Sequence, residues 1–201
     1  MAEFDITRKS RPVLITEYQE RWPAEFQTMA RRIRALAGDA ALRIDHIGST
    51  AVPQLAAKDV IDLQLTVASL DEVAALLPAL RSAGFRQGAE FIYDDFHGKA
   101  ADDPELRKLY MREPEGERRV HIHLREQGRF NQRYALLFRD YLRASPAVRG
   151  EYELLKRRAA QLFPDSIDGY LFLKEPVFHL VYAAAVLWAQ ATGWQPDDQA
   201  L

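Results

Sequence analysis

The pattern of hydrophobic residues changes near Gly128, and this change restricts the folds open to the chain. Before Gly128, short stretches alternate between apolar and polar residues or are rich in β-branched residues, which is typical of strands. The stretch 42–46 alternates in this way and runs into a glycine turn. Further strands are expected over Val13–Glu17, Val60–Val67, Phe85–Tyr93, Leu106–Arg112 and Arg118–Arg125.

Two helices are expected among these strands. The first has apolar residues at helical spacing from Trp22 to Leu36, with Pro23 near its start and Gly38 just past its end. For the second, Ser69 and Glu72 have the spacing of a capping box, and Gly84 closes the helix. Its apolar face is formed by Val73, Leu76, Leu77 and Leu80.

After Gly128 the spacing becomes helical throughout. Phe130 begins one helix, Tyr152 lies in a second, and Ile167–Ala191 forms a third that is expected to bend or break near Pro176. Strands followed by helices indicate an α+β fold with α/β-like character. We expect residues 1–128 to form a mixed-sheet core and residues 129–201 to form a helical part packed on it, as one compact unit.

The amino-acid composition argues against several classes of function. The 27 Lys and Arg residues balance 29 Asp and Glu residues, so the net charge is -2, which argues against general nucleic-acid binding. There is no cysteine, so any metal site must use His, Asp, Glu or backbone oxygen. The longest apolar run, Val177–Trp188, is shorter than the ~20 residues of a membrane span. We therefore expect a cytoplasmic protein without membrane contact. The oligomeric state does not follow from the sequence.

The first candidate site is the turn in the segment Asp45–Pro53. A strand containing His46 ends, Gly48 permits a tight turn, and Ser49 and Thr50 follow. Backbone N–H groups in such a turn can bind phosphate oxygens, and a hydroxyl adds a donor. A turn in which Ser49 or Thr50 merely caps a short helix fits this stretch equally well.

Two further strands carry polar residues on one face. Asp62 and Gln64 share a strand face shortly after Lys58, where a carboxylate is a candidate ligand for a hard cation; a solvated sheet edge is the alternative. His121 and His123 also share a face, where imidazoles can bind a metal or contact a phosphate. Two histidines on the wet face of a sheet are the more common occurrence.

Together these segments resemble the GrpB family, which also occurs as a C-terminal extension of some dephospho-CoA kinases. The resemblance covers nearly the whole chain. It is carried by His46–Pro53, Leu55–Lys58, Ile61-Asp62 and His121–His123, and by Tyr18…Trp22-Pro23…Phe26, Phe138–Arg143, Tyr152…Lys156 and Tyr170…Lys174.

The resemblance implies a nucleotidyltransferase-like fold. In that superfamily a Gly-Ser turn holds nucleotide phosphates, two carboxylates on the next strand bind magnesium, and a later strand adds a third. Gly48 and Ser49 match the turn and Asp62 matches the first carboxylate. Gln64 is neutral at the second position, and His121 or His123 replaces the third. Asp45 or Glu90 could supply a carboxylate from elsewhere. Gln54 and Asp59 also depart from the family's usual glycine and proline.

Three functions remain open. The first is an enzyme, a candidate nucleotidyltransferase, that transfers a nucleotidyl or phosphoryl group to a small molecule. It would use one divalent metal (magnesium, manganese or zinc) at Asp62, His121 and His123, which would also be its catalytic residues. Its ligand would be a nucleotide or phosphorylated small molecule, bound by His46, Gly48, Ser49, Thr50, Lys58 and Gln64.

The second is a catalytically inactive or divergent module that binds a nucleotide, CoA-like or other phosphorylated ligand. The third, and weakest, is a metal-binding hydrolase built on His46, Asp62, His121 and His123.

Overall fold

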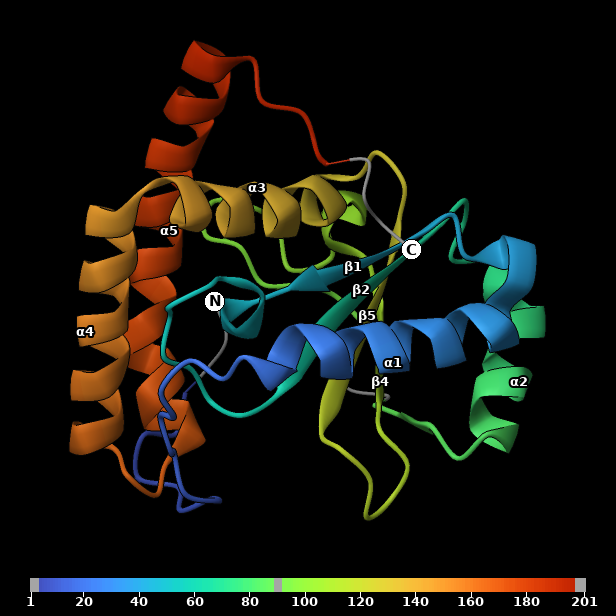
Figure 1. Cartoon of the computed structure of the whole chain (residues 1–201), viewed down its shortest axis with the longest axis horizontal. Coiled ribbons are helices and arrows are strands. Elements are labelled where there is room, and N and C mark those ends of the chain that lie inside the picture. The colour runs from blue at the N-terminus through green and yellow to red at the C-terminus, as the bar shows by residue number, and fades with distance from the viewer. Residues whose placement is uncertain (1–3, 89–91, 198–201) are drawn as a thin grey trace.

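The computed structural model places a mixed five-stranded sheet at the centre of the protein (Figure 1) and describes residues 4–88 and 92–197. The strand order is β1-β2-β5-β4-β3. Only β2 and β5 run parallel; the other neighbouring pairs are antiparallel. The strands are β1 (Arg43–Ile47), β2 (Ile61–Val67), β3 (Arg86–Gln87), β4 (Leu109–Arg112) and β5 (Val120–Glu126).

Helices cover both faces of this sheet (Figure 1). Helix α1 (Arg21–Ala37) packs against β1 and β2, and α2 (Leu76–Ser82) packs against α1. After the sheet come α3 (Phe130–Ala144), α4 (Pro146–Leu162) and α5 (Ile167–Thr192). Of these, α3 contacts β1 and β5, while α5 packs on both α3 and α4. The predicted α+β class, a mixed sheet with flanking helices and a helical C-terminal part, is confirmed.

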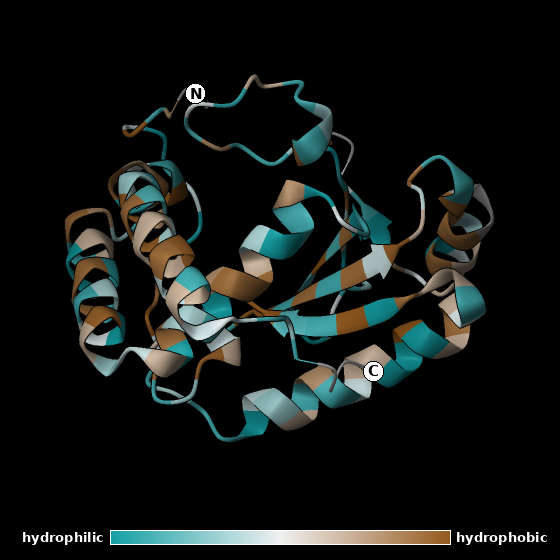
Figure 2. Cartoon of the chain, turned by 90° about the horizontal axis from the view of Figure 1, so that it is seen from above, coloured by the Kyte–Doolittle hydropathy of each residue, from teal (hydrophilic) through white to brown (hydrophobic). Residues whose placement is uncertain are grey.

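The two faces of the sheet differ in chemistry, because successive residues of a strand point to opposite sides. Figure 2 shows hydrophilic and hydrophobic residues alternating along the strands. The apolar face packs against α1 and α2 in the main core, which contains Trp22, Ile33, Ile44, Leu63, Leu65, Ile122 and Leu124. The opposite face carries Asp62, Gln64, His121 and His123. The sheet thus presents a row of polar side chains toward the N-terminal segment and the C-terminal helices.

Several expected elements are shorter than predicted. Val13–Glu17 is not a strand: Thr16 forms only an isolated bridge with Ala57. The strand expected over Phe85–Tyr93 is only the two-residue β3, and residues 89–91 lie outside the described residues. The strand expected from Leu106 begins at Leu109, because Pro104–Leu106 forms a 3-10 turn. Propensity alone could not place these ends, because pairing with a neighbouring strand fixes them.

The expected capping box is wrong. Ser69 Oγ accepts a hydrogen bond from the backbone N–H of Asp71 instead of capping a helix at Glu72. A 3-10 turn over Glu72–Ala75 then precedes α2, so the helix begins later than predicted. This is the local side-chain to backbone bond that serine makes in competition with capping.

Helix α5 continues through Pro176 without the expected break. Pro176 is exposed, so the Phe172 carbonyl that proline leaves without its helical donor lies on the solvent side. By length and composition alone, α5 is apolar enough to cross a membrane: an 18-residue window has a mean hydropathy of 1.4, and 11% of it is buried. Exposed Phe172, Leu180 and Leu187 contribute to this apolar surface. The expected absence of membrane contact stays a prediction.

Candidate functional site

Asp62, His121 and His123 meet on the polar face of the sheet because β2 and β5 pair in a fixed parallel register. Asp62 lies beside His121, and Gln64 lies beside His123. His121 Nδ1 is 3.0 Å from Asp62 Oδ1, and His123 Nε2 is 3.9 Å from the same oxygen. The side chains of all three are half-buried. The carboxylate and both imidazoles therefore surround one point on the sheet.

This group fits a divalent metal ion. One ligand atom from each residue can be chosen so that all three lie within 4.8 Å of one another, the one such group among the described residues. His121 Nε2 and His123 Nδ1 are buried without a hydrogen-bond partner, so each ring has a nitrogen that no protein group occupies. Two imidazoles and one carboxylate suit zinc or manganese better than the all-oxygen shell preferred by magnesium. The donor set supports a single ion.

The protonation states also suit a metal. Burial raises the pKa of Asp62, but hydrogen bonds from His121 and His123 outweigh this effect and hold the pKa well below its usual value. Burial lowers the pKa of His123 to about 4, against the opposing effect of Asp62. Near neutral pH the site therefore offers a carboxylate and, at His123, a neutral imidazole, which are the forms that bind metal ions.

The turn after β1 contacts the same carboxylate. β1 runs antiparallel to β2, and its last residue, Ile47, lies opposite Asp62. Gly48 follows with a φ of +70°, and a Cβ atom added there would lie 2.5 Å from Asp62 Oδ2. Only glycine fits this approach. Half-buried Ser49 then begins a 3-10 turn over Ser49–Ala51, which leaves the phosphate-binding candidate next to Asp62.

Two lysines, Lys58 and Lys174, lie near Asp62, and a third, Lys156, adjoins them. Burial lowers the pKa of Lys58 to about 8, that of Lys174 to about 7 and that of buried Lys156 to about 6. The Lys58 ammonium lies 5.0 Å from the Tyr170 ring centre, and the Lys174 ammonium lies 5.6 Å from it. Lys156 donates a hydrogen bond to the Ala56 carbonyl. We call Lys58, Lys156 and Lys174 the lysine cluster.

The sequence identified Lys58 but not the other two members as site residues. Lys156 and Lys174 lie on α4 and α5, far from Asp62 along the chain, so the sequence alone could not predict that they belong to this lysine cluster. A signal existed in the spacing Tyr152…Lys156 and Tyr170…Lys174, because residues four apart share a helix face. Both tyrosines are buried, and the Lys156 and Lys174 ammonium groups lie over the rings of Tyr152 and Tyr170, respectively.

Three residues that the sequence predicted to bind the ligand, His46, Thr50 and Gln64, have side chains that contact other protein groups instead. His46 lies on the opposite face of the sheet, stacked on Phe26 with ring centres 4.7 Å apart. Its Nε2 is 3.1 Å from the buried hydroxyl of Thr50, which donates to the Val60 carbonyl. Burial lowers the pKa of His46 to about 3, so it is a neutral core residue. His46 is therefore not part of the metal group.

Gln64 is fully buried between β5 and α3. Its amide donates to the Gln132 carbonyl, and its oxygen accepts from Arg125 at 2.7 Å. Arg125 in turn is paired with Asp94. At the position where the resemblance implies a second carboxylate, this chain therefore has an amide whose nitrogen and oxygen both bond to protein groups.

Asp45 and Asp59 do not complete a second metal site, because each is paired with other groups of the protein. Asp45 forms two hydrogen bonds with Arg43, both of 2.7 Å. Asp59 lies away from the site, bonded to Trp22 and Arg118. Glu90 lies outside the described residues.

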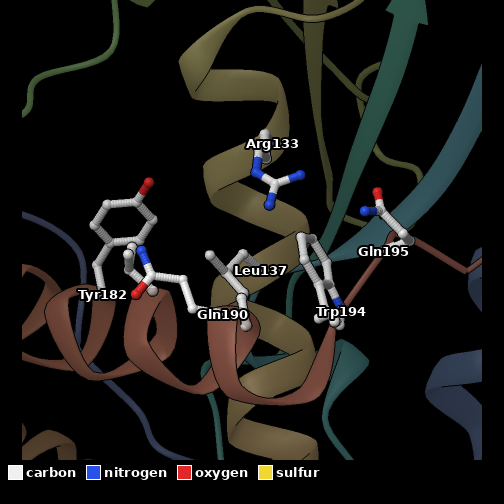
Figure 3. A pocket seen from close by; sticks show the side chains of 9 residues that line it. Arg133, Leu137, Tyr182, Gln190, Trp194 and Gln195 are labelled. Carbon is white, nitrogen blue, oxygen red and sulfur yellow. The ribbon is translucent and has the colours of Figure 1, made fainter.

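A separate cavity of about 340 Å³ lies between α3 and the end of α5 (Figure 3). Figure 3 shows Arg133 and Trp194 side by side, with the guanidinium 5.0 Å from the ring centre. Its lining contains no histidine or carboxylate: Arg133, Leu137, Tyr182, Val186, Ala189, Gln190, Gly193, Trp194 and Gln195. This cavity therefore lacks the histidine and carboxylate ligands of a metal site.

Comparison with known proteins identifies the family. The profile described as GrpB protein matches residues 12–184. The chain belongs to the GrpB family. A GrpB protein from Enterococcus faecalis, solved by crystallography, is 30% identical, with a TM-score of 0.75, and the match covers 88% of this chain and 99% of that one. The UPF0157 protein SCO7215 of Streptomyces coelicolor is 35% identical over 85% of this chain and 83% of its own length.

Longer relatives contain the same unit. A dephospho-CoA kinase of Mycolicibacterium paratuberculosis is 37% identical over 92% of this chain but only 49% of its own length. The chain thus spans about half the length of the dephospho-CoA kinases that it matches. Among solved structures, the Cid1 poly(U) polymerase with Mg 3'-dATP bound is similar at 14% identity and a TM-score of 0.49, covering 79% of this chain and 49% of that one.

Proposed function

We propose that this GrpB protein binds a nucleotide or another phosphorylated small molecule at Asp62 together with one divalent ion, and transfers a nucleotidyl or phosphoryl group to a small-molecule acceptor. One observation carries the proposal: the Gly48–Ser49 turn touches the carboxylate of the metal-compatible group Asp62, His121 and His123. The turn that would bind phosphate therefore adjoins the group that would bind the metal ion. This combination supports phosphate chemistry more specifically than either feature alone.

The charges around Asp62 fit an anionic ligand. Asp62 attracts the ammonium groups of Lys58 and Lys174, and Lys156 adjoins these two lysines. The lowered pKa values of the cluster reflect burial and, for Lys156 and Lys174, repulsion by a neighbouring lysine. A bound phosphate would relieve this repulsion and favour the protonated lysines. Exposed backbone at Gly48 and the hydroxyl of Ser49 would supply further hydrogen-bond donors.

The residues of the metal group would bind the ion and orient one another. Asp62, His121 and His123 would hold a divalent ion, which when bound neutralises phosphate charge and polarises the phosphorus centre. Asp62 also fixes the orientation of the His121 ring through its 3.0 Å contact with Nδ1. In the transfer, the acceptor oxygen forms a bond to phosphorus as the bond from phosphorus to the leaving oxygen breaks, and the acceptor's proton passes to solvent or a nearby base.

A nucleotide panel tests this proposal. ATP, GTP, CTP and UTP would each be supplied with magnesium, manganese or zinc and a mixture of small-molecule acceptors, and release of phosphate or pyrophosphate would be measured. We expect metal-dependent turnover that Asp62→Asn abolishes and that His97→Ala, an exposed histidine outside the site, leaves intact. Absence of turnover, with equal nucleotide binding by wild type and Asp62→Asn, would sink the proposal.

A second candidate is a module that binds a phosphorylated or CoA-like ligand without turnover. The engagement of Gln64 with Arg125 and Gln132 favours it, because the site then lacks the second carboxylate that a two-metal transfer requires. Calorimetry with nucleotides and CoA precursors discriminates between the two. Binding without turnover supports the module, and turnover of any bound ligand excludes it.

A further inference from the structure

Two arginines flank the metal group on the same face of the sheet. Arg112 on β4 lies directly opposite His121 in the antiparallel pair of β4 and β5. Arg119 comes two residues before His121, so its side chain leaves the sheet on the same side. Positions two apart on a strand are separated by about 7 Å, which is within the reach of an arginine side chain.

These arginines have buried nitrogens without partners. Arg119 Nε and Nη2 and Arg112 Nε are shielded from solvent, and no described residue accepts a hydrogen bond from them. Arg112 does donate through Nη2 to Glu113 at 2.9 Å. Burying guanidinium nitrogens without acceptors is costly, and proteins rarely keep such groups where packing is the sole need.

The neighbouring Arg118 shows the contrast. Its guanidinium pairs with Glu25 at 2.8 Å and with Asp59 at 2.6 Å, in the usual manner of a structural arginine. Arg119 has no such ion pair with any carboxylate of the described chain. Two adjacent arginines therefore have opposite environments, and only the one on the face of Asp62 lacks an acceptor.

Other charged groups leave this region positive. The described groups that bear on Arg119 are Arg11 of the N-terminal segment, Arg112, Glu113 and Tyr110. Glu113 is shared among Arg86, Arg112 and the backbone N–H of Val120. Loss of solvent lowers the pKa of Arg11, and repulsion from Arg112 lowers it further. One acid is thus surrounded by several arginines.

We infer that Arg112 and Arg119, with Arg11 beside them, form a second anion-binding subsite next to Asp62, which takes the carboxylate or phosphate of a second ligand. The subsite rests on strands β4 and β5 and adjoins the lysine cluster at Lys58, which Arg11 and Arg119 repel, whereas Lys156 and Lys174 lie on α4 and α5. An arginine fork binds either anion in two-point fashion, which a lysine cannot do. If the proposed function holds, the second ligand is the acceptor, which is then an anionic small molecule.

Neighbouring arginines make a matched test. Inorganic phosphate and succinate would be titrated separately, without metal, into wild type, Arg119→Gln, Arg118→Gln and Lys174→Gln, with affinity measured by calorimetry and Tm by thermal unfolding. We expect Arg119→Gln to weaken binding of at least one probe about tenfold while leaving Tm unchanged or higher. Arg118→Gln should lower Tm and leave affinity unchanged. The probe that loses more affinity identifies the anion class.

The outcomes separate this subsite from the proposed function. Loss of probe binding in Arg119→Gln but not in Lys174→Gln supports the subsite, even if nucleotides never bind at the lysine cluster. Unchanged affinity in Arg119→Gln for both probes overturns it. A lowered Tm in Arg119→Gln, equal to that of Arg118→Gln, also overturns it, because it would assign Arg119 a purely structural role.

Discussion

Gly48 and Asp62 are packed so closely that a single added carbon on the glycine would lie 2.5 Å from a carboxylate oxygen. The turn after β1 and the carboxylate of β2 therefore form one unit, although 14 positions separate them in the chain. The strand pairing of Ile47 with Asp62 creates this contact. Neither residue can change without affecting the other.

Gly48→Ala should damage both stability and ligand binding. The alanine would be strained at a φ of +70°, at a cost of about 1–2 kcal/mol, and its methyl group would displace the Asp62 carboxylate. Gly116→Ala is the matched control: its φ is +77°, but nothing lies within 4 Å of the added carbon. We expect similar backbone strain in both variants and loss of metal affinity only in Gly48→Ala, measured by calorimetry with manganese. Equal metal affinities in the two variants would contradict the role of this contact.

His121→Ala should reduce the affinity for zinc or manganese by at least tenfold, because one of three protein ligands is lost. His97→Ala, at an exposed position, removes a histidine without touching the group and should bind metal like wild type. Metal analysis after dialysis, together with calorimetry, measures the difference. If both variants retain full affinity, the metal lies elsewhere.

Gln64→Glu should not create a second metal site. The new carboxylate would pair with Arg125, whose nitrogen already lies 2.7 Å from the Gln64 oxygen, and the bond donated to Gln132 would be lost. We expect one bound ion per chain, as in the wild type, and a small loss of stability. Two ions per chain in the variant, counted by metal analysis, would show that the position faces the ligand after all.

Lys174→Met should flatten the pH dependence of stability. The pKa of Lys174 is about 7 in the folded protein against an ordinary value of 10.5, so the unfolded chain binds more protons between these values. Wild-type stability therefore rises with pH across this window, and the lysine destabilises the fold most at and below pH 7. Thermal unfolding from pH 6 to pH 10 should show a Tm gain for Lys174→Met at pH 7 that shrinks toward pH 10. A gain that stays constant or grows with pH would contradict the lowered pKa.

The same lysines give ligand binding the opposite trend. Phosphate prefers the protonated lysine cluster, so the affinity of a phosphorylated ligand should fall as pH rises from 6 to 9. Binding at pH 8 should be accompanied by proton uptake, which calorimetry in buffers of different ionisation enthalpy detects. Affinity that does not depend on pH would remove the lysine cluster from the binding site.

The sequence predicted the metal group but not its surroundings. The two-residue period of strands was sufficient to place Asp62 with Gln64, and His121 with His123, on common faces. The register between strands was out of reach, and it is the register of β1 against β2 that brings Gly48 onto Asp62. Spacing within a strand fixes faces, whereas neighbours on other strands depend on pairing.

Long-range packing hid the remaining residues. Lys156 and Lys174 reach the site only because α4 and α5 fold back beside the sheet, and a lysine in a helix is usually solvated. Gln64 matched a ligand position of the superfamily, yet its partners, Arg125 and Gln132, come from later segments. Both outcomes are set by tertiary contacts that local patterns do not encode.

The most direct test of the central claim is a crystal structure of the wild-type protein with manganese and a non-hydrolysable ATP analogue, with anomalous diffraction used to locate the metal. The account predicts one manganese peak bound by Asp62, His121 and His123, with phosphate oxygens at Ser49 and the lysine cluster. A peak remote from Asp62, or an analogue bound with its phosphates away from the Gly48–Ser49 turn, would contradict it.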